Sequence, residues 1–530
     1  MRLMRMIIVI AVAVELFSCA QMAPLTGGAK DNYPPVVNQA KVHPPNYSTN
    51  FSSNGIVIEF DDYIKLDKKT NISINPGVSV QPTYRVKGKK LFVELDGDLS
   101  DNTTYSINFG NNIQDITESN VLKNFKYVFS TGDFIDSLDF RGTVYSAQSG
   151  LPLEGAIVGL YSENSDSIPY DTPPNYIGVS NSAGWFNIGN IKTGAYKVIT
   201  LTDENNNYMY DEYSEGIGFS SEPVQLEGVD SNASMIDIFA FYPIAKNLTI
   251  ESKEGYKNGG ANVAFNRSVE GNAFGLLETD DVILESWNEH RDSLYLLVSR
   301  DKKNIKFTLK QDDNRLDTIT VTLSKKQSKF KLSSVPKQLD SREELSLSFT
   351  NAVAEFMAED IDLIQDSARM PITVLSKHQT PYQLVISGNY VPNENYKITL
   401  DSASIIDVAG RAIEETSFSF STYKENYFGH LGVNIITNNH SNMFVELLDP
   451  KGNSVRISES FYGAQAIHFD DLKPGKYAVR LIYDDNYNNV WDTGNYPEKI
   501  QPERVVRYNK LIEIRSNWNL NEDWELDKSR

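Results

Sequence analysis

Apolar side chains recur at every second position in short runs along most of this chain. The runs within the first 130 residues are Ile56, Ile58 and Phe60; Leu91, Val93 and Leu95; Tyr105, Ile107 and Phe109; and Phe125, Tyr127 and Phe129. A period of two is the pattern of a β-strand with one buried face. Turns rich in Asn, Asp, Gly and Pro separate the runs at spacings typical of a β-sandwich, and long helical patterns are nearly absent. The sequence therefore predicts an all-β protein.

A first repeat relates residues 34–132 to residues 336–423. The segment NTTYSI at 102–107 parallels NENYKI at 393–398, and FKYVFST at 125–131 parallels FSFST at 418–422. The isoleucine and aspartate at 113–115 have counterparts at 406–407. Two copies of one sandwich are expected from this pattern.

A second repeat relates residues 135–243 to residues 424–530. The residues that carry it are Ile188, Ile191, Gly194 and Tyr196 in the first stretch and Phe469, Leu472, Gly475 and Tyr477 in the second. Gly permits a tight reversal before an aromatic residue enters the next strand, so this spacing closes one end of a sandwich. Residues 244–335 lie between the repeats and show further alternation. We expect another β unit there, of uncertain type.

Two resemblances follow from these segments. Residues 27–31 (GGAKD) and 60–66 (FDDYIKL) resemble the start of the SbsA-type bacterial Ig-like domain found near the N-terminus of many Bacteroidetes lipoproteins, which implies an Ig-like fold for 34–132 and, less specifically, for 336–423. The spacing at 188–196 and 469–477 resembles the transthyretin-like fold of carboxypeptidase regulatory-like domains, seven short strands without the peptidase.

The N-terminus has the pattern of an export signal followed by a lipid attachment site. Arg2 and Arg5 precede an apolar run at 7–14, and Cys19, the single cysteine, follows that run. A lone cysteine forms no internal disulfide, and its place resembles the lipobox of bacterial lipoproteins. We therefore expect a signal peptide at 1–18, lipidation of Cys19 and a tether at 19–33 rich in Gly and Pro. An uncleaved anchor is the alternative, although the apolar run is short for a membrane span.

Two acidic loops repeat one arrangement of oxygen-bearing side chains. The first has Asp203, Asn205, Asn207 and Asp211, and the second has Asp484, Asn486, Asn488 and Asp492. Side chains at positions one, three, five and nine are the layout of a calcium-binding loop, because a chain that curls around a hard cation turns alternate side chains inward. A structural calcium ion is therefore one interpretation of both loops.

The calcium pattern is incomplete. Position six, normally Gly, holds Tyr208 or Asn489, and position twelve, normally Glu, holds Ser214 or Asn495. Asn and Asp also stabilise turns by bonding to their own backbone, so a loop rich in both residues needs no ion. The nearby aromatic residues are open to two interpretations as well: Tyr208, Tyr210, Tyr213 and Trp491 either plug the end of a sandwich or form a contact surface.

Charge and missing motifs narrow the function. With 50 Lys and Arg against 70 Asp and Glu, the formal charge is −20, which excludes nucleic acid as a partner. The six histidines show no zinc-ligand spacing, and the chain has no nucleophile elbow, P-loop or dinucleotide-binding glycine motif. An enzyme is therefore not expected.

The preferred function is a lipid-anchored scaffold of the outer membrane that binds an envelope protein, such as an outer-membrane β-barrel. Surface-exposed members of the lipoproteins that this chain resembles often carry acidic residues just after the lipid cysteine. Residues 20–23 have none, so the resemblance favours the periplasmic face without excluding the cell surface. The alternative function is a glycan-binding surface lipoprotein. An enzyme with dispersed catalytic carboxylates is the least favoured class.

Overall fold

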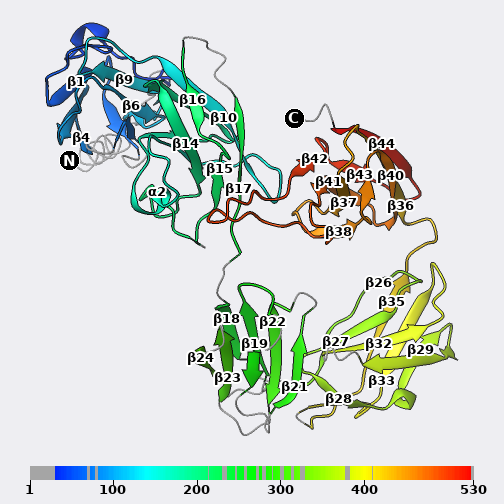
Figure 1. Ribbon diagram of the computed structural model, residues 1–530. Coiled ribbons are helices and arrows are strands. Elements are labelled where there is room, and N and C mark those ends of the chain that lie inside the picture. Colours follow the sequence, from blue (N-terminus) through cyan, green and yellow to red (C-terminus); the bar gives the residue numbers. More distant parts are fainter. Residues whose placement is uncertain are drawn as a thin grey trace, which may run out of the picture.

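The computed structural model is built almost entirely of short antiparallel strands (Figure 1). It describes residues 30–67, 72–77, 81–212, 214–228, 235–244, 248–255, 260–269, 274–276, 282–288, 291–298, 304–311, 315–322, 329–376, 382–408 and 410–526. The predicted signal peptide, Cys19 and most of the tether lie outside these residues. Within them, none of the helices has the length and apolar character to cross a membrane. The all-β prediction is confirmed.

Unit 1, residues 30–132, has three small sheets around one core. Its strands are β1 (Gly55–Glu59), β2 (Ile64–Leu66), β3 (Ser73–Asn75), β4 (Gln81–Lys87), β5 (Lys90–Asp96), β6 (Thr104–Gly110), β7 (Ile113–Asp115), β8 (Val121–Leu122) and β9 (Phe125–Ser130), after the 3-10 turn η1 (Gln39–Lys41). The sheets have the orders β1-β5-β4, β3-β6-β9 and β2-β7-β8. Leu91, Val93 and Leu95 on β5 are all buried, as their alternation predicts.

Unit 2, residues 135–243, packs a three-stranded sheet against a five-stranded one. Its elements are β10 (Leu138–Ser146), β11 (Ile157–Tyr161), α2 (Ile168–Asp171), β12 (Tyr176–Val179), β13 (Trp185–Ile191), β14 (Gly194–Leu201), β15 (Ile217–Phe219), β16 (Val224–Leu226) and β17 (Ile236–Ala240). The small sheet has the order β13-β10-β17, and the large one β12-β11-β14-β15 with β16 also on β14. The core between them includes Phe140, Phe186 and Val198.

Unit 3, residues 248–322, also contains two sheets. Its strands are β18 (Ile250–Gly255), β19 (Gly260–Phe265), β20 (Phe274–Leu276), β21 (Val282–Trp287), β22 (Ser293–Val298), β23 (Asn304–Gln311) and β24 (Arg315–Thr322). They pair in the orders β18-β19-β22-β21 and β20-β23-β24. Val263, Leu294 and Val321 belong to a core of buried residues, so the β unit expected in this region is present.

Unit 4, residues 329–423, repeats the plan of unit 1. Its elements are β25 (Leu332–Ser334), β26 (Gln338–Leu339), β27 (Leu345–Phe349), β28 (Val353–Phe356), η5 (Ala358–Asp360), β29 (Ile361–Gln365), β30 (Ala368–Met370), β31 (Ile372–Ser376), β32 (Gln383–Gly388), β33 (Asn395–Leu400), β34 (Ile405–Asp407) and β35 (Thr416–Thr422). The sheets have the orders β25-β27-β32-β31, β26-β35-β33-β29-β30 and β28-β34.

The hydrogen bonds of one tyrosine show that units 1 and 4 share a local geometry. The Ser100 amide donates to the Tyr105 hydroxyl oxygen at 2.8 Å, and the Val391 amide donates to the Tyr396 hydroxyl oxygen at 2.7 Å. In both units a threonine hydroxyl then donates to the carbonyl of that same Ser or Val, at 2.7 and 2.6 Å. The sequence repeat between residues 102–107 and 393–398 therefore corresponds to a repeated hydrogen-bond pattern.

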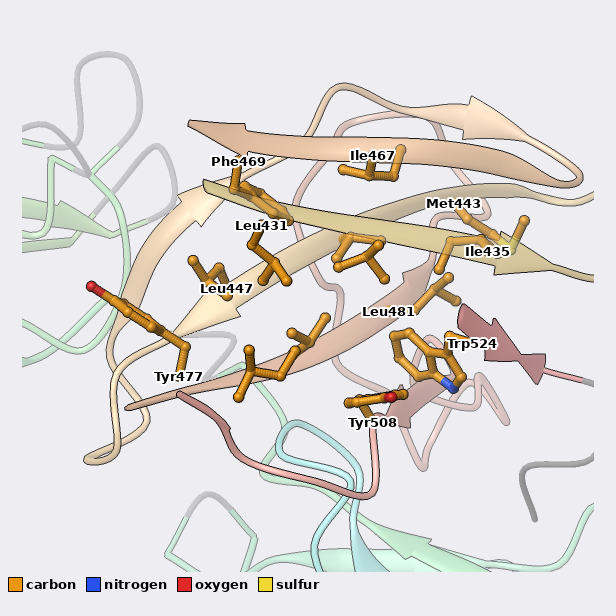
Figure 2. Packing of buried hydrophobic residues seen from close by; sticks show 14 of the residues in the cluster. Leu431, Ile435, Met443, Leu447, Ile467, Phe469, Tyr477, Leu481, Tyr508 and Trp524 are labelled. Atoms are coloured by element: carbon orange, nitrogen blue, oxygen red, sulfur yellow. The ribbon is translucent and has the colours of Figure 1, made fainter. Parts of the chain in front are cut away.

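Unit 5, residues 424–526, repeats the plan of unit 2. Its strands are β36 (Gly429–Ile436), β37 (Asn442–Leu448), β38 (Ser454–Ile457), β39 (Phe461–Tyr462), β40 (Gln465–Leu472), β41 (Gly475–Tyr483), β42 (Val505–Arg507), β43 (Ile512–Ile514) and β44 (Asn519–Glu525). One sheet is β40-β36-β44, and the other is β38-β37-β41-β42 with β39 on β37 and β43 on β41. Figure 2 shows the side chains between the sheets, with Trp524 packed edge-on against Tyr508 at 5.4 Å.

The first and last strands of units 2 and 5 are neighbours and run parallel. β10 pairs with β17, and β36 pairs with β44. Gly142 on β10 and Gly432 on β36 make this approach possible, because a Cβ at either position would collide with the Ile236 carbonyl oxygen or the Asn521 side chain. The two units therefore share topology as well as sequence spacing.

The chain does not extend as a straight string. Figure 1 shows units 3 and 4, in green and yellow, below units 2 and 5, and the loop after β41 reaching back to β15 and β17. Tyr295 of unit 3 contacts Tyr382 of unit 4, and Arg342 of unit 4 forms an ion pair with Asp471 of unit 5 at 2.5 Å. Units 2 to 5 thus form a closed ring, which the sequence repeats do not predict.

Candidate functional site

The two acidic loops begin where equivalent long strands of units 2 and 5 end. β14 leads into the first loop and β41 into the second. A tyrosine at the start of each strand fixes the preceding turn: the Tyr196 hydroxyl donates to the Lys192 carbonyl at 2.8 Å, and the Tyr477 hydroxyl donates to the Lys473 carbonyl at 2.7 Å. Both loops therefore start from the same framework.

The structure brings the four predicted residues of the first loop together through hydrogen bonds. Asp203 accepts backbone N–H groups from Asn206 at 2.7 Å and from Tyr208 at 2.9 Å. The Nδ2 groups of Asn205 and Asn207 both donate to Asp211 Oδ2, at 2.5 and 3.2 Å. The Oδ1 atoms of the same two asparagines accept the backbone N–H groups of residues 207 and 209.

The second loop has nearly the same hydrogen bonds. Asp484 accepts the backbone N–H groups of Asn488 and Asn489 at 3.1 and 3.0 Å. Asn486 and Asn488 each donate from Nδ2 to Asp492 Oδ2 at 2.7 Å. This side-chain to backbone bonding accounts for the shared register of the two loops.

Positions four and six of both loops have a left-handed backbone. The φ angles are 61° at Asn206 and 59° at Tyr208, and 65° at Tyr487 and 58° at Asn489. Tyr208 therefore adopts the conformation for which a calcium loop normally uses Gly, although a bulky residue there costs roughly 1–3 kcal/mol. The backbone curls the same way in both copies despite their different residues at position six.

Each loop is closed by a buried glutamate that the sequence pattern missed. Glu215 accepts the backbone N–H groups of Glu204 and Asp211, at 3.1 and 3.2 Å. Glu503 accepts those of Asp485 and Asp492, at 2.9 and 3.0 Å. Glu215 follows its last loop aspartate by four residues and Glu503 by eleven, so no common spacing pointed to them.

The environment of both glutamates raises their pKa. The first cause is burial, since Glu215 is 2% and Glu503 is 7% exposed. The negative charges of the neighbouring loop aspartates raise the pKa further, and the backbone N–H groups act in the opposite direction. Each loop thus concentrates carboxylates in a partly desolvated place.

The side-chain atoms that each loop offers as ligands determine whether it could bind a metal ion. Among the residues that the structure describes, no group of three or more His, Cys, Asp and Glu side chains is arranged to hold one. Carboxylate and amide oxygens are the kind of ligand that calcium takes. However, Asn205 and Asn207 turn their N–H groups toward Asp211, so their amides would have to rotate to place oxygens around a cation.

The aromatic residues of the loops mainly plug the sandwich ends. Tyr210 is 3% exposed, and its ring packs against that of Tyr170 in a tilted arrangement with the centroids 5.3 Å apart. The Trp491 indole donates to the Glu503 carbonyl at 3.0 Å and packs against Ile482 and its neighbours. Burial, and then the nearby Tyr208, raise the pKa of Tyr84 on β4, so the tip of the first loop lies close to unit 1. Tyr213 lies outside the described residues.

Loop two continues into a segment that contacts unit 2. Tyr496, only 1% exposed, is buried in a cluster with Tyr210, Phe219 and Phe241 of that unit. Its ring lies 5.3 Å from Phe219 in an edge-on arrangement. The side-chain amide of Gln501 donates to the carbonyl of Phe219, which lies 282 residues earlier in the sequence. The second acidic loop therefore leads directly into a contact between unit 5 and unit 2.

A hollow of about 430 Å³ at the junction of units 4 and 5 offers charged side chains that pair with one another. Arg342 bonds Asp340 at 2.7 Å and Asp471 at 2.5 Å, and it lies over the Phe428 ring. Arg342 lowers the pKa of Asp340, with burial acting in the opposite direction. These ion pairs join units 4 and 5, and each of the three charged side chains, Arg342, Asp340 and Asp471, has a partner of opposite charge.

Many solved structures resemble this chain, and three of them illustrate the range. They are the Bacillus anthracis TIE protein (10% identity, 94% of this chain and 75% of that chain, TM-score 0.17), BcpA, the major pilin subunit of Bacillus cereus (10%, 74% and 99%, 0.15), and SGBP-B of the Bacteroides ovatus mixed-linkage glucan utilization locus, solved with a mixed-linkage heptasaccharide (9%, 72% and 92%, 0.19). At these values the function has to be argued from the chain's own residues.

The sequence comparisons place only the first unit in a family. No curated protein sequence matches the chain. Residues 31–131 match the model of the bacterial Ig-like domain, which agrees with the resemblance noted for residues 34–132. Unit 1 is therefore a bacterial Ig-like domain.

Proposed function

We propose that this protein is a non-catalytic, lipid-anchored scaffold of the bacterial cell envelope. The observation that carries the proposal is the ring of units 2 to 5, whose junctions use buried aromatic residues and ion pairs. Such a body holds several surfaces in a fixed arrangement. Preorganised surfaces lose little conformational entropy when they bind a large partner. Lipidation of Cys19 would attach it to the outer membrane, and the tether at 19–33 would hold it away from the lipid.

The partner that we propose is an envelope protein, with an outer-membrane β-barrel as the preferred class. The test is affinity purification of the tagged protein from detergent-solubilised envelope. Recovery of one envelope protein in a constant ratio supports the scaffold, whereas recovery of the tagged chain alone argues against it. A Cys19→Ala variant is the control for attachment, and labelled palmitate should be incorporated only by the wild type. Protease treatment of intact cells then distinguishes the periplasmic face from the cell surface.

A second candidate function is glycan binding, and one exposed aromatic pair favours it. Tyr462 and Tyr487 are 59% and 67% exposed, and their ring centroids lie 6.4 Å apart at an angle of 37°. Exposed aromatic rings of this kind can stack on the apolar faces of sugars. Retention on polysaccharide gels that is lost in the double variant Tyr462→Ala and Tyr487→Ala would support this function. Unchanged retention in that variant would exclude this pair as the site.

The calcium interpretation stays a proposal for both loops. Asp203, Asn205, Asn207 and Asp211 would hold one ion, and Asp484, Asn486, Asn488 and Asp492 the other. Such an ion would offset the like charges that raise the pKa of Glu215 and Glu503. Calorimetric titration of chelator-treated protein with Ca²⁺ tests it: saturable heat together with a higher melting temperature supports the proposal, and no heat in the millimolar range refutes it.

A further inference from the structure

The part of the chain between Asp492 and Glu503 is longer than its counterpart in unit 2. Asp211 and Glu215 are separated by three residues, whereas Asp492 and Glu503 are separated by ten. The flanking hydrogen bonds are the same in both loops, because each glutamate accepts the backbone N–H of the aspartate that precedes the interval. The second loop therefore carries seven extra residues, and we call residues 493–502 the docking segment.

The docking segment occupies an aromatic face of unit 2. The buried residues of that face lie on or beside β11, β14, β15 and α2, and include Tyr161, Ile168, Leu201, Tyr210, Ile217 and Phe241. Tyr496 is the one residue of unit 5 that is fully buried in this cluster, and Trp491 packs at its margin. A buried tyrosine with its hydroxyl satisfied is a typical anchor of a specific interface.

Polar contacts surround the Tyr496 ring. Its hydroxyl donates to the Asp166 carbonyl at 3.1 Å, and the Thr493 hydroxyl donates to the Tyr242 carbonyl at 2.8 Å. Lys499 forms an ion pair with Asp166 at 2.7 Å and lies over the Tyr496 ring at 4.0 Å. The face thus recognises both the shape and the charge of this segment.

Hydrogen bonds within unit 5 also shape the docking segment. Asn495 and Ile500 exchange two backbone hydrogen bonds at 2.8 and 2.9 Å, which closes the segment into a turn. Glu503 and the Trp491 indole fix its base. A preorganised segment loses little conformational entropy on docking, and linkage within one chain supplies a high effective concentration.

We propose that the docking segment is an intramolecular latch that closes units 2 to 5 into a ring. The segment binds the aromatic face of unit 2 of the same chain. Among the residues that the structure describes, its release leaves units 2 and 5 joined only at the edge of that face, where Arg480 donates to the Gln148 carbonyl and Arg507 to the Ser149 carbonyl. The inference shares the ring of units 2 to 5 with the proposed scaffold. Its test measures ring closure in the isolated chain, whereas the scaffold is tested by recovery of a partner, so the two failures can be told apart.

The test uses the exposed ion pair of Lys499 with Asp166. Lys499 Nζ lies 2.7 Å from Asp166 Oδ1 and the two side chains are 39% and 71% exposed, so a zero-length carbodiimide should join them through an amide bond in the closed ring. The full-length soluble chain is cross-linked at low concentration as a mixture of ¹⁵N-labelled and unlabelled protein, and the linked peptides are analysed by mass spectrometry. A link within one isotopic species supports the latch. Absence of the link, or its occurrence mainly between labelled and unlabelled chains, overturns it.

Two variants identify the residues that hold the latch. Tyr496→Ala should reduce the Lys499–Asp166 link at least tenfold and increase the radius of gyration measured by X-ray scattering. Gly494→Val should do the same without removing an aromatic group, since a Cβ at Gly494 would lie 2.6 Å from the Phe241 ring. Tyr487→Ala is the matched control, because Tyr487 lies in the same loop but is 67% exposed. A wild-type link and an unchanged radius in both Tyr496→Ala and Gly494→Val would refute the proposal.

Discussion

The side chain of Asn75 in unit 1 forms with the backbone of Ile177 in unit 2 the two hydrogen bonds that a neighbouring strand would otherwise form. Its side-chain amide donates to the Ile177 carbonyl and accepts the Ile177 N–H, both at 2.8 Å, across 102 residues of sequence. Ile177 lies on β12, which is at the edge of its sheet. The pair therefore covers an open edge and joins the two units at the same time.

Replacing Asn75 by Ala should loosen this junction. Asn75 is 6% exposed, so the change leaves two backbone groups of Ile177 without partners in a poorly hydrated place, at roughly 1–3 kcal/mol each. Hydrogen exchange should therefore become at least tenfold faster in peptides that contain β12. Asn75→Asp keeps the acceptor and loses the donor, and we expect an intermediate rate. Equal exchange in wild type and Asn75→Ala would contradict this account.

The repeated tyrosine contacts of units 1 and 4 predict matching effects of two substitutions. Tyr105→Phe and Tyr396→Phe each remove a buried hydroxyl that accepts a backbone N–H, at a cost of about 1 kcal/mol. Exchange should accelerate by a similar factor in the peptides of β6 and of β33, respectively. Tyr47→Phe is the control, since Tyr47 is 59% exposed. An effect in only one of the two units would mean that the same hydrogen bond stabilises the two units to different degrees.

Glu503 should influence the latch more strongly than Glu215 does. Glu503→Ala removes the acceptor of two backbone N–H groups at the base of the docking segment, and charged acceptors contribute about 1.5–3 kcal/mol each. We expect the Lys499–Asp166 cross-link to fall several-fold in this variant. Glu215→Ala disturbs the first loop in the same way but leaves residues 493–502 intact. A comparable loss of the cross-link in both variants would show that the latch depends on general stability.

The ion pairs of Asp166 give the latch a predictable response to pH. Lys197, then Lys499, lower the pKa of Asp166 from its ordinary value of 3.8 to about 2. A lowered folded-state pKa contributes stability above the ordinary pKa and loses it as the pH falls through about 2. The radius of gyration of the wild type, which Tyr496 still holds closed, should therefore change little with pH, while that of Tyr496→Ala should be constant between pH 5 and 8 and increase below about pH 4. Asp166→Asn should remove the part of this increase that belongs to the ion pairs.

Salt should weaken the same ion pairs. Asp166 is 71% exposed, so ions reach the pairs readily. In 1 M NaCl the contribution of Lys499 should be small, while Tyr496 should continue to hold the segment through apolar contact. The cross-link yield of Tyr496→Ala should consequently decrease further with salt, and that of the wild type should change little. If the wild-type latch opened in salt, the ion pairs, and not the apolar contacts of Tyr496, would supply most of the free energy that holds it closed.

Period-two alternation was sufficient to predict the strands and the all-β class. Leu91, Val93 and Leu95 are buried on β5 because a strand turns alternate side chains to one face. The same reasoning found the repeats, whose tyrosines then proved to have equivalent hydrogen bonds. Local pattern and tertiary structure agree wherever one sheet face supplies the core.

The latch could not be predicted in this way. Tyr496 lies in a segment without alternation, between Asn495 and Pro497, and its partners come from a unit nearly 300 residues earlier. Asn75 gave no signal either, because an amide that binds a strand edge has no characteristic neighbours. The acidic loops were recognised by their spacing, but Glu215 and Glu503 were missed since the intervals before them differ in length.

The parallel pairing of first and last strands has a mechanical consequence for units 2 and 5. Tension applied through the chain ends would pull β36 and β44 in opposite directions along their length, because neighbouring parallel strands enter and leave a unit at opposite ends. The seven residue pairs from His430 with Asn519 to Ile436 with Glu525 would then be sheared together instead of being unzipped one by one. A protein tethered at its N-terminus and loaded at its far end would resist extension through these two clamps, and single-molecule pulling should record them as the highest rupture forces of the chain.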